Sequence, residues 1–391
     1  MINQTEQTLF RLSNLNAEQT RISYQIATGK NIDNGSEDAS GYSREIFVDD
    51  RIRTYEGIKY QIERTTAQNN VSDSTIGEMK KLFELVKTEL IKANTDTTSD
   101  EGRKSIALNV AGIKENLLDL ANTQVEGEYL FAGSDSSIQP FKEVNGEIDY
   151  QGDNISRKIV VDDGSYRERG VNGYDIMSYP SSTAMKDEAL NFKADDVIID
   201  QDGSVWKFVE ADITSVPAAV SPYNVDNIQK FDSSGNSVGI MAIDSNNGST
   251  PPTYTIDNVG SEDGTKFEAR TNIFDLLDTI TNALNKTDSD GNTISDDEAS
   301  DILNQSQEAF SDSYDALNVA HSELGSKNQM FEISLERVSA KLTQYNILSQ
   351  EIGAADLTKV AIESKALELT YTALYSTIQK TNELSLVNFL K

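Results

Sequence analysis

Apolar residues recur at alternating spacings of three and four positions from Leu303 to Ile352, in the last third of this 391-residue chain. Eleven of the fifteen positions in this register are apolar: Leu303, Phe310, Tyr314, Leu317, Leu324, Phe331, Leu335, Val338, Leu342, Tyr345 and Ile352. Such spacing places side chains along one face of an α-helix, where a partner helix packs. Because no proline interrupts the run, we predict one helix about 75 Å long, at about 1.5 Å per residue. The fold must therefore contain a helical rod and helices that pair with it.

The two ends of the chain carry matching registers of the same kind. The sequence from Gly353 to Asp356 interrupts the long register, and a new one begins at Leu357. We predict that the N-terminal and C-terminal helices pack on each other as a coiled coil, with the first helix ending at Gly29, a residue suited to a left-handed cap. The apolar residues of the two registers, here called the assembly seam, are Leu12, Leu15, Ile22, Ile26, Leu357, Val360, Leu367, Leu374 and Ile378.

Helical periodicity also covers much of the first third of the chain. A second long helix is predicted from about Ser43 to Ala93, and a third helix carries the register from Ile106 to Leu120. All six prolines and the single tryptophan, Trp206, lie between residues 140 and 252, where the apolar period falls towards two. Residues 197–199 and 205–209 read as a β-hairpin. The fold class is therefore mainly α, with an inserted β-rich domain between helices.

These patterns divide the chain into five predicted segments. Residues 1–42 form an N-terminal coiled-coil segment that pairs with residues 353–391, the C-terminal coiled-coil segment. Residues 43–133 and 271–352 form the two parts of the helical rod. Residues 134–270 form the inserted β-rich domain.

The composition limits the classes of partner. With 34 Lys and Arg against 64 Asp and Glu, the net charge is −30, and such a field disfavours nucleic acid and anionic membrane surfaces. The chain has no cysteine, which excludes disulfides and thiolate metal sites. The first residues lack the pattern of a cleaved signal peptide, and no apolar run is long enough to span a membrane. We expect no membrane anchor and no use of the general secretory route.

Two patterns and the single histidine, His321, suggest chemistry, and each lacks a required part. Residues 235–239 match the G-x-S-x-G pattern of hydrolases, but a polar loop surrounds them and the only histidine, His321, lies far away in the sequence. Residues 288–292 resemble a calcium loop, yet Lys286 occupies the position that needs a carboxylate. We therefore predict no catalytic, metal-binding or cofactor-binding site, and we expect that the protein is not an enzyme.

Two stretches resemble one family of proteins. Residues 25–41, which include Gly29, Lys30 and Asp38, resemble the N-terminal signature of bacterial flagellins and their relatives. The second stretch is more discriminating and resembles a motif of the flagellar hook-associated protein 3 family. It consists of residues 127–133, which include Tyr129, Leu130, Phe131 and Gly133, preceded by residues 120–122 and followed by residues 140–141. Residues 150–153 and the closing segment 385–390 are also similar to that family.

The resemblance implies a structural protein of the bacterial flagellum, located outside the cell at the junction between hook and filament. It implies export through the flagellar type III apparatus, aided by an export chaperone. The implied partners are neighbouring copies in a ring, hook-associated protein 1 and the first flagellin subunits. No cofactor is implied. A filament flagellin is the alternative, although flagellins usually carry Phe-Asn-Gly where this chain has Phe131-Ala132-Gly133. An enzyme on a flagellar scaffold would need a site in the β-rich insert.

Overall fold

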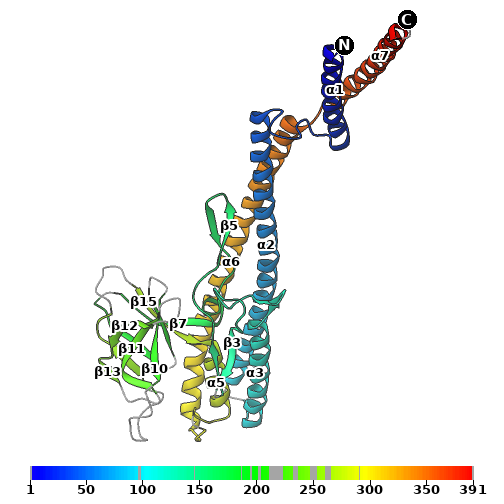
Figure 1. The fold of residues 1–391 in the computed structure, drawn as a ribbon. Helices are drawn as coiled ribbons and strands as arrows, with labels where there is room; N and C mark the ends of the chain where they lie inside the picture. The colour runs from blue at the N-terminus through cyan, green and yellow to red at the C-terminus, as the bar shows by residue number, and fades with distance from the viewer. Residues whose placement is uncertain are drawn as a thin grey trace. The chain divides into compact units, whose positions relative to one another are not determined.

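The computed structural model describes residues 2–95, 98–144, 146–185, 187–193, 196–200, 204–210, 223–231, 237–246, 253–259, 266–289 and 291–389. The chain forms two compact units: a terminal unit, residues 1–60 with 335–391, and a central unit, residues 61–334. Two long helices, α2 (Ala39–Ala93) and α6 (Asp296–Gly353), contribute to both units (Figure 1). Both were predicted as single helices, and their continuity confirms that prediction.

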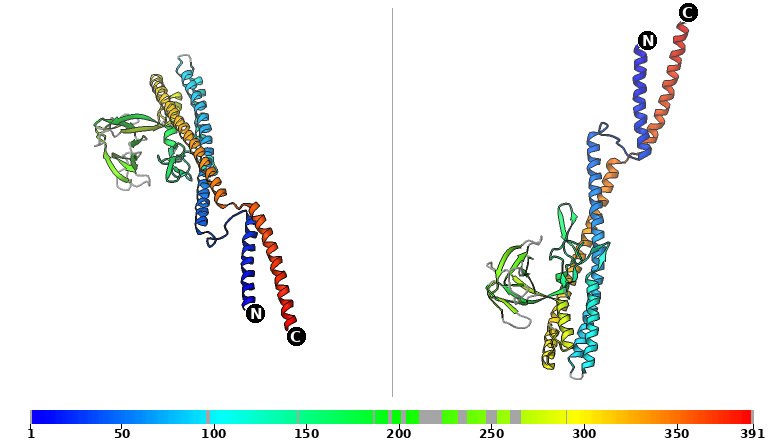
Figure 2. Two further views of the ribbon diagram at one scale, coloured as in Figure 1. Left: turned by 90° about the horizontal axis from the view of Figure 1, so that it is seen from above. Right: turned by 60° about the horizontal axis from the view of Figure 1, so that its bottom comes forward.

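The terminal unit contains the two end helices, α1 (Ile2–Thr28) and α7 (Leu357–Phe389). Figures 1 and 2 show them side by side, with the N- and C-termini at the same end of the pair, so that the helices run antiparallel. Helix α1 ends where predicted, because Gly29 adopts the left-handed conformation with φ of 70°. In the same unit, α2 and α6 pack together through stacked rings of Tyr55 and Tyr345, with centroids 5.5 Å apart.

Helices α2 and α6 form the core of the central unit with α3 (Asp100–Ala121) and α5 (Ile273–Leu284). The α6 register predicted from the sequence is confirmed, because every seventh residue is fully buried: Leu303, Phe310, Leu317, Leu324, Phe331 and Val338. Small side chains occupy further buried positions of α6, with Ser306, Ser313, Ala320 and Ser334 each 2–5% exposed. Small residues at a helix interface let the backbones of the two helices approach closely.

Short hairpins after α3 complete the same core. Their strands are β1 (Gln124–Val125) with β2 (Glu128–Tyr129), β3 (Phe141–Val144) with β4 (Glu147–Tyr150), and β5 (Lys158–Asp162) with β6 (Ser165–Glu168), followed by α4 (Gly173–Met177). The hairpins and α4 bury Phe131, Phe141, Ile148, Ile176 and Met177 among the helices. Residues from 141 to 177 thus contribute to the helical core, whereas the sequence pattern grouped residues 134–177 with the β-rich insert. The difference arises because turn signals mark strands without showing which core the strands cover.

The β-rich insert has a second core of its own. A six-stranded sheet has the order β12-β11-β10-β9-β15-β7, and a three-stranded sheet has the order β13-β14-β8. The bounds are β7 (Ser178–Met185), β8 (Leu190–Lys193), β9 (Val197–Asp200), β10 (Val205–Glu210), β11 (Tyr223–Phe231), β12 (Ser237–Ala242), β13 (Ser245–Asn246), β14 (Thr253–Ile256) and β15 (Lys266–Asn272). Strands β9 and β10 pair antiparallel, which confirms the predicted hairpin strands; residues 201–203 of its turn lie outside the described residues.

One antiparallel ladder joins the two cores of the central unit. Strands β7 and β15 pair from Ser178 and Asn272 at one end to Met185 and Lys266 at the other. Near the first end, Tyr179 is buried in the helical core; near the second, Phe267 is buried in the sheet core. The insert thus connects to the rod through two neighbouring strands.

Within the described ranges, none of the helices combines the length and the apolar composition that a membrane crossing requires.

This ladder predicts where the insert can be removed. Replacing residues 184–267 by Asn-Gly would join Thr183 to Glu268, which already face each other across the ladder. We expect the helical core to keep its thermal unfolding midpoint within a few degrees. Deleting residues 140–265 instead would remove Phe141 and Ile148 from that core and should unfold it. Circular dichroism melts of the two deletion proteins check this, and a cooperative wild-type-like melt of the longer deletion would contradict it.

Candidate assembly surface

The structure brings most of the assembly seam into the interface between α1 and α7. Ile22 and Val360 are buried, at 3% and 4% exposure, and a further set is half-buried: Leu12, Leu15, Leu367, Leu374 and Ile378. Ile26 and Leu357 are 53% and 56% exposed and do not contribute to this pairing. Gln25 occupies the buried position in the last turn of α1 instead, because its Nε2 donates a hydrogen bond to the Asn31 carbonyl at 2.7 Å.

The packing of α1 against α7 leaves part of their apolar surface exposed. A groove of about 700 Å³ lies between α1 and α7. Its lining includes apolar residues, namely Leu15, Ile22, Leu367 and Leu374, and charged residues, namely Arg11, Glu18 and Glu363. Polar contacts hold the helices on either side of it: Arg21 lies 3.2 Å from Glu363, and the Tyr371 hydroxyl donates to the Asn16 side-chain oxygen at 2.6 Å. Other large apolar side chains of the pair are also exposed, namely Leu9, Phe10, Ile362, Leu369 and Tyr375. A helix pair with this much uncovered apolar surface is typical of a protein that packs against other helices.

Two short linkers, residues 29–38 and 353–356, meet beside this pair and are here called the joint. The Asn31 amide donates to the Gly353 carbonyl at 2.7 Å, and the Ala355 amide donates to the Gly29 carbonyl at 2.8 Å. Lys30 and Ala354 therefore form an isolated antiparallel bridge. The motif residues Gly29 and Lys30 thus tie the end of α1 to the start of α7.

The joint also starts the two helices that follow it. The Asp38 carboxylate accepts from the Ser40 and Gly41 amides, each at 3.0 Å, and so caps α2. The Asp356 carboxylate accepts from the Thr358 and Lys359 amides at 3.0 and 3.1 Å and caps α7 in the same way. Capping of α2 thus gives Asp38, a residue of the N-terminal signature, a structural role.

The residues Tyr129–Gly133, here called the junction motif, lie in the central unit. Phe131 is fully buried in the helical core, Leu130 is half-buried beside it, and the Tyr129 amide donates to the Ser136 carbonyl at 2.9 Å. Gly133 has φ of 83°, and a Cβ there would lie 2.3 Å from Oδ1 of Asp153 and 2.4 Å from its carbonyl oxygen. Only glycine meets both the backbone conformation and the close approach of Asp153.

Tyr150 locks the junction motif to the neighbouring loops. Its hydroxyl donates towards the Phe131 and Asp153 carbonyls at 2.9 and 3.0 Å and accepts from the Gly173 amide at 3.2 Å. Burial raises the pKa of the Tyr150 phenol well above its usual range, so the group stays protonated and keeps its donor. These bonds explain the motif at residues 150–153 as a support for the junction motif.

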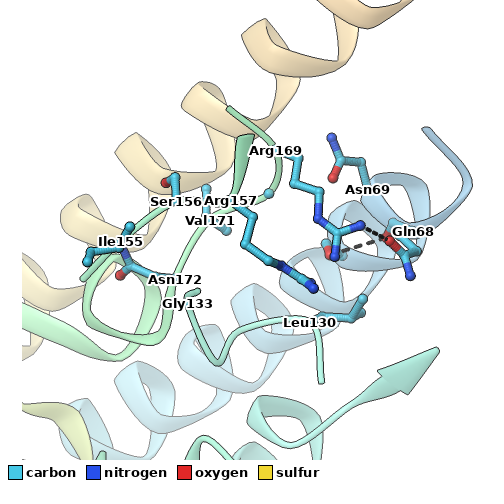
Figure 3. A pocket seen from close by; sticks show the side chains of 12 residues that line it. Gln68, Asn69, Leu130, Gly133, Ile155, Ser156, Arg157, Arg169, Val171 and Asn172 are labelled. Atoms are coloured by element: carbon cyan, nitrogen blue, oxygen red, sulfur yellow. Dashed lines mark hydrogen bonds between the residues drawn. The ribbon is translucent and has the colours of Figure 1, made fainter. Parts of the chain in front are cut away.

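A cluster of arginines surrounds Glu128, immediately before the junction motif. Arg64, Arg157 and Arg169 lie 3.3, 3.3 and 3.1 Å from its carboxylate. Burial would raise the pKa of Glu128, but the hydrogen bond from Arg169 and the charge of Arg157 outweigh burial and lower it. Figure 3 shows Arg157 and Arg169 extending between α2, at Gln68 and Asn69, and the loop that carries Leu130 and Gly133. The cluster fixes the junction motif to α2.

Asn122, which precedes the junction motif, holds the first residue of β3. Its Nδ2 donates to the Phe141 carbonyl at 2.9 Å, and its Oδ1 accepts from the Phe141 amide at 3.0 Å. Asn122→Asp keeps the acceptor but loses the donor, so we expect a loss of about 1–3 kcal/mol in the free energy of unfolding. Urea unfolding would measure it. Asn116→Asp, at an exposed site on α3, is the matched control; equal losses for both variants would contradict this role for Asn122.

The described parts of the two patterns and His321 each have local contacts. His321 lies in the central unit with its Nε2 2.9 Å from Oδ1 of Asp73. In the loop at 288–292, Asp288 accepts from the Asn292 amide at 2.7 Å. Of residues 235–239, only Ser237–Gly239 lie in the described part, within β12. In the described ranges, no three His, Asp or Glu side chains are grouped to hold a metal ion.

Comparison with known proteins shows which proteins this chain resembles. Residues 2–136 match the family described as the bacterial flagellin N-terminal helical region. The matched region contains α1, α2, α3 and the hairpin of β1 and β2. Proteins named flagellar hook-associated protein 3 are 27% identical over 231 residues in Salmonella typhimurium and 29% over 183 residues in Escherichia coli. The chain is thus similar to proteins named flagellar hook-associated protein 3 over part of its length.

The extent of the similarity differs between sequence and structure. The aligned parts span 58% of this chain and 67% of the Salmonella protein, and 46% of this chain and 56% of the Escherichia coli protein. The crystal structure of flagellar hook-associated protein 3 from Legionella pneumophila covers 78% of this chain and 98% of that chain, with a TM-score of 0.51 and 18% identity. At that identity the comparison shows a common fold, mainly α with a central β-rich region, which confirms the predicted fold class.

Proposed function

We propose that this protein is a structural subunit of the bacterial flagellum that forms the junction between hook and filament and receives the first flagellin subunits. The observation that carries the proposal is the open groove between α1 and α7, whose lining includes four large apolar side chains, in a chain similar to hook-associated protein 3. A groove lined by Leu15 and Leu374 on facing helices suits a helix from a neighbouring subunit. Residues of this kind serve assembly and not catalysis, so the protein is not an enzyme.

The partners follow from that role. Neighbouring copies of this chain pack side by side in a ring through the assembly seam, with hook-associated protein 1 on one side and flagellin on the other. Ile26 and Leu357, which the pairing of α1 with α7 leaves more than half exposed, meet these neighbours. The chain reaches the outside of the cell through the flagellar type III apparatus with the help of an export chaperone. The same apolar surface needs protection before assembly.

A deletion strain tests this function and separates it from that of a filament flagellin. If the protein forms the junction, cells without it should carry hooks of normal length, few filaments, and flagellin shed into the medium. Electron microscopy of the cells and immunoblots of the medium give both readouts. Cells that still assemble filaments at the normal frequency would show that the protein is not required at the junction. Cells that export no flagellin because this chain is the filament subunit itself would favour the alternative.

A further inference from the structure

A carboxylate is buried beneath the joint. Glu45 on α2 is 5% exposed, and its Oε1 lies 2.6 Å from Nζ of Lys30. Its other oxygen, Oε2, has no hydrogen-bond partner among the described residues, and neither has Oε1 of Gln25, which is 2% exposed. Burying a carboxylate is unfavourable unless an opposite charge and hydrogen bonds compensate for its lost hydration. Closing the joint therefore carries a large unfavourable contribution.

Among the described residues, the buried side chain of Ile32, a few hydrogen bonds and one ion pair offset it. Across the joint the backbone contributes the Asn31–Gly353 and Ala355–Gly29 hydrogen bonds, and Gln25 adds its bond to Asn31. The ammonium of Lys30 is the cation that the structure places on Glu45, and the Lys30 side chain is 47% exposed. The Asp49 carboxylate, 3.6 Å from the same ammonium, lies towards solvent at 37% exposure. Lys30 can therefore leave Glu45 for water without moving either helix.

We propose that the Lys30–Glu45 ion pair is a latch, and that the joint is a two-state element that closes when this pair forms and opens when it breaks. The backbone contacts across the joint lie on consecutive residues of two short linkers. When the ion pair breaks, the buried carboxylate of Glu45 has no compensating charge, and these backbone contacts break together. Opening hydrates the carboxylate and frees the backbone on either side of Gly29 and Gly353. The α1–α7 pair then changes direction relative to the adjoining ends of α2 and α6, without the unwinding of a helix.

Three variants of the full chain test the latch. Lys30→Met keeps a similar side-chain length and removes the charge, which leaves Glu45 buried without its cation. The double variant Lys30→Met with Glu45→Met replaces the ion pair by apolar side chains of similar size, an exchange that many proteins tolerate. Lys365→Met is the matched control, because Lys365 pairs with Glu368 on the surface of α7, and both side chains are well exposed.

Hydrogen exchange of the Asn31 and Ala355 amides reports directly on closure. We expect Lys30→Met to speed both by about tenfold, the double variant to restore the wild-type rates, and Lys365→Met to change neither. Added salt should speed exchange in the wild type and not in the double variant. Because the chain has no cysteine, spin labels at Ser23→Cys and Glu56→Cys can follow the same change; we expect a broader distance distribution only in Lys30→Met.

The double variant separates a latch from simple packing. If Lys30 and Glu45 only filled space, their effects would add, and the double variant would exchange faster than Lys30→Met; that result would overturn the proposal. Unchanged exchange in Lys30→Met would overturn it as well. All measurements use the isolated chain, so failure of the latch would leave the proposed junction function untouched.

Discussion

Leu374→Asp is expected to abolish assembly of this protein into flagella while its synthesis and export continue. Leu374 lines the groove between α1 and α7 with Leu15 and Leu367, so a helix that fills the groove would bury the new carboxylate. An unpaired buried charge costs several kcal/mol, and a pair of isolated helices has little stability with which to compensate. The expected phenotype is hooks with few filaments and shed flagellin, measured by electron microscopy and by immunoblots of the medium.

The control for this prediction is Lys365→Asp on the same helix. Lys365 is well exposed and lies 2.7 Å from the exposed Glu368, and pairs of this kind contribute little to stability. We expect filaments close to normal in number. Wild-type filaments in the Leu374→Asp strain would show that the groove is not an assembly surface. Intracellular degradation of the Leu374→Asp protein would be visible in the same immunoblots and would separate misfolding from failed assembly.

Gly133→Ala is expected to destabilise the central unit by about 3 kcal/mol. A non-glycine residue in the left-handed region costs about 1–2 kcal/mol, and displacing the packed Asp153 backbone that lies 2.4 Å from the added Cβ costs about as much again. Tyr150 holds Asp153 in place through the hydrogen bond to its carbonyl, so that backbone has little room to move. Urea unfolding followed by circular dichroism measures the change in free energy.

Gly127→Ala isolates the contribution of the backbone conformation. Gly127 has φ of 80°, close to the 83° of Gly133, but a Cβ there meets no atom within 4 Å. We expect a loss of only about 1–2 kcal/mol, and the difference between the two variants is the effect of Asp153. Equal losses would mean that Asp153 moves aside freely and that the junction motif needs glycine for its φ alone.

The helical part of the fold followed from the sequence because its buried positions are large and apolar. Leu303, Phe310 and Leu317 repeat at helical spacing, and each is fully buried. Ser306 and Ser313 are buried on the same helix, yet serine carries no apolar signal, so the sequence did not reveal them. Ile26 fits the spacing of the assembly seam. It lies near the end of α1, however, where Gln25 is the buried residue instead. Spacing rules assume a continuing helix and fail in its last turn.

The contacts that support the motif residues could be identified only from the tertiary structure. The sequence singled out Gly29, Lys30 and Asp38, but the partners of Lys30 and Gly29 are Glu45 on the next helix and Ala355 near the opposite end of the chain. Likewise the strands of the insert were predictable from their period of two. The assignment of Phe141 and Ile148 to the helical core could not be predicted, because the sequence of a short hairpin does not indicate which core the hairpin covers.

The contacts between α1 and α7 have a consequence for incomplete chains. Arg21 reaches Glu363 across 342 positions of sequence, and Asn31 finds its acceptor only at Gly353. A fragment that stops before Gly353 therefore lacks both the second half of the joint and the whole facing helix. However such a fragment arises, α1 has nothing to pair with and cannot build the groove. The proposed assembly surface therefore forms only where both end helices are present in one chain.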